Sequence, residues 1–199
     1  MNPWVKAQMG ERSFHCDEDG WGGCSLAERR AREKVQRGVY AGLLGIGYEV
    51  PPASVTDIGC GPESLLLTAP AAQMVAVDPT AFLPEDEARY AAAGITRAIV
   101  PAEDYTGPQT EEVWMYNCLQ HTIDPMKVLG VVTSHAAKRI RLFEWTHVPT
   151  DRLHLHKLSE AQLIGALQRA GFAMERQTMG RCEDGGRPTS FYAGVWRRA

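Results

Sequence analysis

The residues best suited to bind a nucleoside lie in two short segments, 55–64 and 74–79. Asp57, Gly59 and Gly61 come at the end of an apolar run, and Asp78 directly follows a second one. Glycine has no Cβ, so these positions let the backbone turn sharply and approach a ligand closely. A carboxylate at a strand end can accept hydrogen bonds from both ribose hydroxyls. The two segments therefore predict a turn and an acid that hold an adenosine.

A strand, a turn, a helix and a second strand must position these residues. The run Val55–Ile58 is typical of a strand buried on both faces, and Val75–Val77 predicts the next one. From Pro62 we expect a helix, because proline suits a first helical turn and Leu65–Leu67 give it an apolar face. The alternation of strand and helix is typical of a parallel sheet with ligands at the carboxyl ends of its strands.

This arrangement resembles the class I S-adenosylmethionine (SAM) dependent methyltransferases, through Asp57, Gly59, Gly61 and Asp78. The segment 112–125 is similar to the fourth strand and the following turn in the small-molecule branch of that family. The resemblance implies an α/β, Rossmann-like three-layer sandwich. Its seven-stranded sheet is mostly parallel and ends in an antiparallel hairpin. It also implies SAM as cofactor and S-adenosylhomocysteine as product.

The resemblance assigns further cofactor contacts to the turns after each strand. The turn after the third strand reads the adenine edge, where we expect Ala102 and Glu103, and Asn117 follows the fourth strand at the methionine end. The complete set expected at the cofactor is Asp57, Gly59, Cys60, Gly61, Asp78, Pro79, Ala102, Glu103 and Asn117.

Methyl transfer to a hydroxyl needs one further group, a base near neutral pH, and histidine fits that role. His121 follows the predicted fourth strand, and Glu144 and His147 follow the fifth, so we expect these three to orient or deprotonate the acceptor. Aromatic and polar residues of the N-terminal segment and of the loop after the fifth strand are expected to contact the acceptor: Trp21, Tyr40, His154 and His156.

Residues 1–52 are expected to form a cap, and residues 53–199 the SAM-binding domain. Segment 2–23 shows no sustained period of either kind. A helix is predicted from the capping box of Ser25 and Glu28 to about Leu44. The remaining expected elements are helices over 85–93 and 124–137, strands over 98–100, 113–116 and 139–143, a helix opening at Ser159, and a hairpin of 172–179 with 190–196.

Composition limits the remaining possibilities. The chain has 199 residues, 44% of them apolar, and a formal charge of -3, which suits one globular unit without bulk attraction to nucleic acid or membranes. No stretch approaches the roughly 20 apolar residues of a membrane span. The five cysteines are scattered, which favours reduced thiols and a cytoplasmic protein.

Several other interpretations stay open. The glycine turn nearly fits a nicotinamide dinucleotide fingerprint, although its third small residue is Ser64. His147, Asp151, His154 and His156 suggest metal ligands, but without a register that fits, so we expect no metal. The basic run 29–37 is interrupted by Glu33 and is interpreted as a solvated helix face.

We therefore expect a methyltransferase acting on oxygen or nitrogen of a small-molecule or sugar acceptor. The alternatives are a SAM- or nucleoside-binding regulatory protein without transfer activity and a nucleic-acid (tRNA or DNA) methyltransferase. Glu63 stands where the family commonly has a third glycine, which keeps the regulatory alternative open.

Overall fold

A computed structural model describes residues 2–17, 24–184 and 187–199. The helices are α1 (Pro3–Cys16), α2 (Leu26–Leu44), α3 (Pro84–Ala92), α4 (Pro125–His135) and α5 (Glu160–Arg169). Short 3-10 helices lie at η1 (Leu65–Leu67), η2 (Ala102–Asp104) and η3 (Leu119–His121). The strands are β1 (Ser54–Ile58), β2 (Gln73–Val77), β3 (Thr96–Ala98), β4 (Thr110–Tyr116), β5 (Ala136–Thr146), β6 (Phe172–Asp184) and β7 (Arg187–Arg198).

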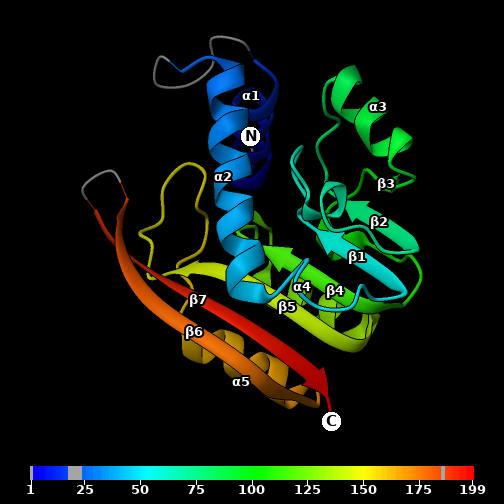
Figure 1. Cartoon of the computed structure of the whole chain (residues 1–199). Coiled ribbons are helices and arrows are strands. Elements are labelled where there is room, and N and C mark those ends of the chain that lie inside the picture. Colours follow the sequence, from blue (N-terminus) through cyan, green and yellow to red (C-terminus); the bar gives the residue numbers. More distant parts are fainter. Residues whose placement is uncertain (1, 18–23, 185–186) are drawn as a thin grey trace.

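Within the described residues, seven strands form one sheet in the order β3-β2-β1-β4-β5-β7-β6 (Figure 1). The strands β1 to β5 are parallel, and β7 runs antiparallel to both β5 and β6. This confirms the predicted mixed sheet with its C-terminal hairpin. Because strand order reverses between β1 and β4, the carboxyl ends of these strands diverge and leave a crevice for a ligand.

Helices cover both faces of the sheet (Figure 1). On one face α4 and α5 bury Val128, Val132 and Leu163 against Ile140 and Leu142 of β5. On the other face the second half of α2 and η1 pack on the sheet, through a cluster that includes Tyr40, Leu44, Leu65, Trp114, Tyr116 and Phe143. Helix α2 begins at the predicted capping box and ends at Gly45, whose φ of 71° terminates the helix in the left-handed region.

The helix expected from Pro62 does not form. Between β1 and β2 only the single turn of η1 is helical, because Ser64 has extended backbone (φ -58°, ψ 144°) and caps η1 with its side chain. Pro70 lies soon after η1, where it would interrupt a longer helix. The second half of α2 occupies the sheet face beside η1 instead.

Although segment 2–23 shows no sustained period in the sequence, its residues 3–16 form the helix α1. Asn2 caps this helix by accepting a hydrogen bond from the Trp4 N–H, and Pro3 occupies its first turn. Its hydrophobic pattern is weak because α1 lies over a polar region, and Ala7 is its buried residue. Strand β3 begins two residues earlier than expected, and β4 and β5 are longer than expected.

Candidate functional site

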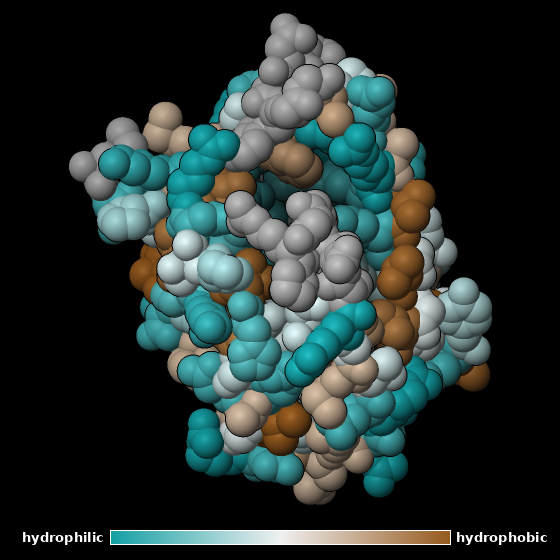
Figure 2. Space-filling model, turned by 90° about the vertical axis from the view of Figure 1, so that its left-hand side faces the viewer, coloured by the Kyte–Doolittle hydropathy of each residue, from teal (hydrophilic) through white to brown (hydrophobic). Residues whose placement is uncertain are grey.

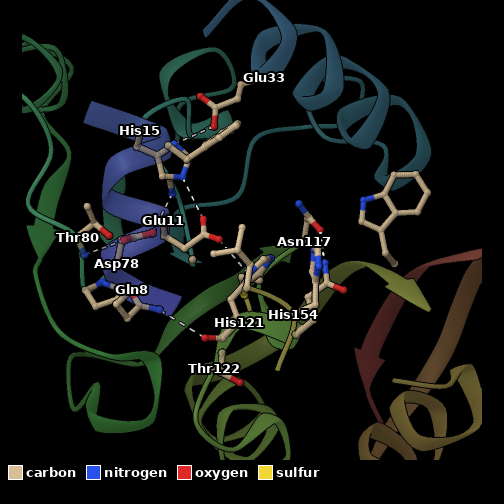
Figure 3. A pocket seen from close by; sticks show the side chains of 18 of the residues that line it. Gln8, Glu11, His15, Glu33, Asp78, Thr80, Asn117, His121, Thr122 and His154 are labelled. Carbon is tan, nitrogen blue, oxygen red and sulfur yellow. Dashed lines mark hydrogen bonds and ion pairs between the residues drawn. The ribbon is translucent and has the colours of Figure 1, made fainter. Parts of the chain in front are cut away.

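A cavity of about 830 Å³ lies at the carboxyl ends of β1, β2 and β4. Its walls come from the glycine turn, from the turns after β2 to β5, and from α1 and the first half of α2. One face of the molecule is hollowed, and hydrophilic side chains are among those at the edge of the hollow (Figure 2). Close to the sheet, side chains from α1 and from the turn after β4 point toward one another across the cavity (Figure 3).

The turn after β1 needs glycine for two different reasons. Gly59 (φ 69°) and Gly61 (φ 59°) have left-handed backbone, and both line the cavity. A Cβ at Gly59 would lie 2.3 Å from the Cβ of Cys118, and one at Gly61 would lie 3.0 Å from Nη2 of Arg37. The turn is therefore packed against the turn after β4 and against a cationic side chain of α2.

Asp57 and Cys60 are not among the residues that line the cavity, in contrast to the expected cofactor contacts. The carboxylate of Asp57 is buried and accepts hydrogen bonds from the hydroxyls of Ser64 and Tyr116. Burial raises the pKa of Asp57 to about 6, although these hydrogen bonds oppose the shift. The Cys60 thiol is also buried and accepts from Nη1 of Arg97 at 3.1 Å. Both side chains support the turn from the inside.

Asp78 follows β2 and lines the cavity together with Pro79. Its Oδ2 accepts from the Gly61 N–H at 3.1 Å, and its Oδ1 accepts from the Thr80 N–H at 2.9 Å. The acid after β2 is thus fixed directly beside the glycine turn after β1, as the sequence predicts. A carboxylate oxygen has two lone pairs, so each oxygen keeps capacity for a further donor.

The turn after β3 brings Ala102 and Glu103 to the cavity wall. Glu103 is 7% exposed, and its Oε1 accepts from the backbone N–H groups of Ile123 (2.6 Å) and Asp124 (3.1 Å). This acid therefore connects the turn after β3 to the start of α4.

Asn117 directly follows β4 with a φ of 56° and lines the cavity. Its Oδ1 accepts from Nε2 of Gln120 at 3.0 Å.

Glu144 lies beneath this turn, where its Oε1 accepts from the N–H groups of Cys118 and Leu119, each at 3.0 Å. Glu144 is fully buried and is not part of the cavity wall, so the expected direct contact with an acceptor is corrected. Burial raises the pKa of Glu144 to about 7, against the effect of the two N–H groups.

Helix α1 supplies site residues that sequence reasoning missed. Nδ1 of His121 lies 3.1 Å from Oε1 of Glu11, and His15 lies between Glu11 (3.6 Å) and Glu33 of α2 (3.1 Å) (Figure 3). Burial lowers the pKa of His15, but the two carboxylates outweigh it and raise that pKa to about 9. Burial and Glu11 oppose each other in the same way at His121, and its pKa is also raised. We call Glu11, His15, Glu33 and His121 the α1 clasp.

The expected acceptor residues are divided between the cavity and its surroundings. His154 lines the cavity, and its Nδ1 lies 3.0 Å from Oδ2 of Asp151. His147 also lines it, half-exposed, with Nε2 2.7 Å from Oε2 of Glu160. His156 is outside the wall, because its Nε2 bonds to the carbonyl oxygen of Thr122 at 2.9 Å.

Tyr40 does not form a wall of the cavity as expected. Its ring is 2% exposed and stacks on Phe143 with ring centroids 4.1 Å apart, because its position on α2 faces the sheet. Trp21 lies outside the described residues.

Three arginines of the basic run are not on a solvated helix face. Arg29 is 3% exposed and donates to the carbonyl oxygens of Phe14, Asp17 and Cys24. Arg30 pairs with Asp86 at 2.6 Å. Arg37 lines the cavity, with its guanidinium 4.6 Å from the centre of the Tyr116 ring. Within the described part of the chain, the buried Nε of Arg37 has no hydrogen-bond partner.

No helix in the described part of the chain is long and apolar enough to cross a membrane. A group of three or more histidine, cysteine, aspartate or glutamate side chains arranged to hold a metal ion is also absent from residues 2–17, 24–184 and 187–199.

No protein-family model and no curated protein matches the chain. Solved structures do. Magnesium protoporphyrin IX methyltransferase from Synechocystis PCC 6803 with bound SAM is 18% identical, with a TM-score of 0.69 over 100% of this chain and 98% of that chain. A Burkholderia thailandensis 1,6-didemethyltoxoflavin-N1-methyltransferase is 17% identical, with a TM-score of 0.69 over 98% of this chain and 88% of that chain.

The [4+2]-cyclase SpnF is also similar, at 13% identity and a TM-score of 0.64, over 98% of this chain and 93% of that chain. The same fold therefore serves more than one reaction, and an activity has to be argued from the site. The chain has the Rossmann-like fold of the SAM-dependent methyltransferases.

Proposed function

We propose that the chain is a SAM-dependent methyltransferase that methylates oxygen or nitrogen of a small-molecule or glycan-like acceptor. The observation that carries this proposal is the direct contact of Asp78 with the Gly61 N–H at the wall of the cavity. It joins an acid suited to ribose hydroxyls to a glycine turn suited to close approach. The cavity of about 830 Å³ lies in the upper part of the usual range for small-molecule sites, about 300–1,000 Å³, which leaves room for an acceptor beside the cofactor.

The residues at the cavity wall fit the parts of SAM in chemical terms. Asp78 would hold the ribose hydroxyls, and Ala102 and Glu103 would lie at the adenine. Gly59 and Gly61 leave backbone surface free of Cβ atoms. The methionine end carries a carboxylate, and Arg37 beside Gly61 offers it a cationic donor, because its buried Nε has no hydrogen-bond partner among the described residues. Asn117 would lie at the same end.

The sulfonium of bound SAM supplies an electrophilic methyl group, so the protein has three tasks: to orient the acceptor, to exclude water and to take up one proton. Helix α1 and the loop after β5 both line the cavity, and they are positioned to perform the first two tasks. Glu144 and Asp57 act indirectly, since they hold the turns that carry the wall residues.

The similar structures support a small acceptor. The Synechocystis enzyme is a methyltransferase of magnesium protoporphyrin IX, and the Burkholderia enzyme was solved with 1,6-didemethyltoxoflavin and S-adenosylhomocysteine. Both align with 98% or more of this chain at TM-scores of 0.69.

Titration calorimetry with three ligands tests the cofactor. We expect SAM and S-adenosylhomocysteine to bind, and NAD to give no heat of binding. Binding of NAD without binding of SAM or S-adenosylhomocysteine would reject the proposal in favour of a dinucleotide site. Binding of the two adenosyl ligands without any labelled-methyl transfer across a broad panel of phenols, alcohols and amines would favour the regulatory alternative.

A further inference from the structure

Two histidines lie next to each other in the cavity wall. His121 comes from the turn after β4 and His154 from the loop after β5, and their ring centroids are 5.0 Å apart (Figure 3). A single cavity thus presents two imidazoles to an acceptor. Their partners differ, and the partners decide which of the two can take a proton.

His121 is paired with the Glu11 carboxylate. Its side chain is 16% exposed, and Nδ1 lies 3.1 Å from Oε1 of Glu11. Burial alone would lower the pKa of His121, but the Glu11 carboxylate outweighs burial, and Glu144 adds to the upward shift. The pKa of Glu11 is well below its usual value, since His121 and His15 outweigh its burial, so Glu11 stays ionised. This pairing favours the protonated form of His121, and an imidazolium has no free lone pair and cannot act as a base.

His154 also pairs through Nδ1 with a carboxylate, but it is more exposed than His121. Its Nδ1 lies 3.0 Å from Oδ2 of Asp151, while Oδ1 of Asp151 accepts from the N–H groups of Leu153 (2.7 Å) and His154 (2.8 Å). Burial raises the pKa of Asp151, but these backbone bonds and His154 outweigh it and hold that pKa at about 2. The carboxylate is therefore ionised and accepts a proton-bearing Nδ1, which leaves the lone pair of the neutral ring on Nε2.

The second ring nitrogen is available. Among the described residues, none forms a hydrogen bond with Nε2 of His154, and the side chain is 28% exposed at the cavity wall. The loop itself is anchored, because the Leu155 N–H donates to the carbonyl oxygen of Gln120 at 2.8 Å and the Asp151 N–H donates to that of His154 at 2.9 Å. Nε2 is thus a fixed acceptor in a water-accessible position from which a proton can leave.

We propose that His154, oriented by Asp151, is the general base for the acceptor, and that the neighbouring His121, paired with Glu11, does not serve as the base. This inference rests on the proposed function. As a bond forms between the acceptor atom and the methyl carbon, the electron pair of the carbon–sulfur bond stays on sulfur. The proton of the acceptor O–H or N–H goes to Nε2 of His154, and the imidazolium is then stabilised by Asp151 before it loses the proton to water. The substrate class is therefore a protic acceptor, an alcohol, a phenol or an N–H compound.

Nitrogen-15 NMR of the histidine rings tests the protonation states in the full chain with S-adenosylhomocysteine added. His154→Gln and His121→Gln assign the two sets of signals. We expect the neutral form of His154 to carry its proton on Nδ1, and the Asp151→Ala variant to lose this tautomer preference. The pKa of His121 should lie above that of an unperturbed histidine. A neutral His154 with its proton on Nε2, or a His121 whose pKa is not raised above that of an unperturbed histidine, would overturn the inference.

Turnover provides the second measurement, with labelled-methyl SAM and a panel of phenols, alcohols and amines. For acceptors that the wild type methylates, His154→Gln should lower turnover by about 100-fold or more, while the affinity for S-adenosylhomocysteine stays within a few-fold. His135→Gln on α4, outside the cavity, is the matched control. Full turnover in His154→Gln would remove His154 as the base. A wild-type protein that does not bind S-adenosylhomocysteine would instead contradict the proposed function.

Discussion

Nδ1 of His121 lies 3.1 Å from Oε1 of Glu11, which joins the turn after β4 to helix α1 across the cavity. His15 extends this connection to Glu33 of α2. The α1 clasp is therefore ionic, and its strength depends on two histidines whose pKa values are raised.

The clasp predicts a specific dependence of stability on pH. The pKa of His15 is about 9 in the folded chain and about 6.5 when unfolded, so its contribution is complete below pH 6.5 and disappears as the pH rises toward 9. The pKa difference sets an upper limit of about 3 kcal/mol. The free energy of unfolding should be measured at pH 6 and pH 9 for the wild type and His15→Gln. We expect the difference between the two proteins to shrink at pH 9, and a difference that is equal at both values would contradict the clasp. His135→Gln controls for the loss of a histidine elsewhere.

The glycine turn predicts unequal effects of two Gly→Ala substitutions. A Cβ added at Gly94 (φ 70°) would have no atom within 4 Å, so Gly94→Ala tests the effect of the left-handed backbone alone. We expect it to lower the free energy of unfolding by about 1–2 kcal/mol. Gly59→Ala would also place its Cβ 2.3 Å from the Cβ of Cys118, so it should lower the free energy of unfolding clearly more. Chemical denaturation measures both. Equal costs would show that the turn after β1 is not packed against the turn after β4.

Arg37 predicts a difference between two ligands. If its guanidinium holds the carboxylate of the methionine end, Arg37→Gln should weaken S-adenosylhomocysteine binding by about tenfold or more, the usual effect of losing a charged hydrogen bond. Methylthioadenosine lacks that carboxylate, so its affinity should stay nearly unchanged. Lys34→Gln, at an exposed position on α2 that does not line the cavity, is the matched control. If the affinities for both ligands fall equally, Arg37 stabilises the glycine turn and does not bind the carboxylate.

The sequence was sufficient for the parts of the site that depend on local pattern. Gly59, Gly61 and Asp78 were predicted because a strand, a turn and a following acid are encoded within neighbouring residues, and all three line the cavity. Asp57 belongs to the same motif, yet its carboxylate is directed inward to Ser64 and Tyr116. This could not be predicted from the local pattern, because Tyr116 is 59 positions away in the sequence.

The acceptor side could not be predicted in this way, because its chemistry depends on contacts between distant segments. His121 was identified by its position after β4, but its pKa is raised by Glu11 of α1. The weak apolar pattern of α1 did not predict that helix from the sequence. Tyr40 lies on a helix with apolar residues on several sides, so the sequence did not show that it faces the sheet.

The affinity of Asp78→Ala for SAM tests the central claim most directly, because this carboxylate is proposed to hold the ribose and lies at the glycine turn. Calorimetry should show a loss of about 1.5–3 kcal/mol, or roughly tenfold to a hundredfold, relative to the wild type. Glu85→Ala removes an exposed acid at the start of α3 and should bind SAM as the wild type does. Wild-type affinity for SAM in a folded Asp78→Ala protein would contradict the account.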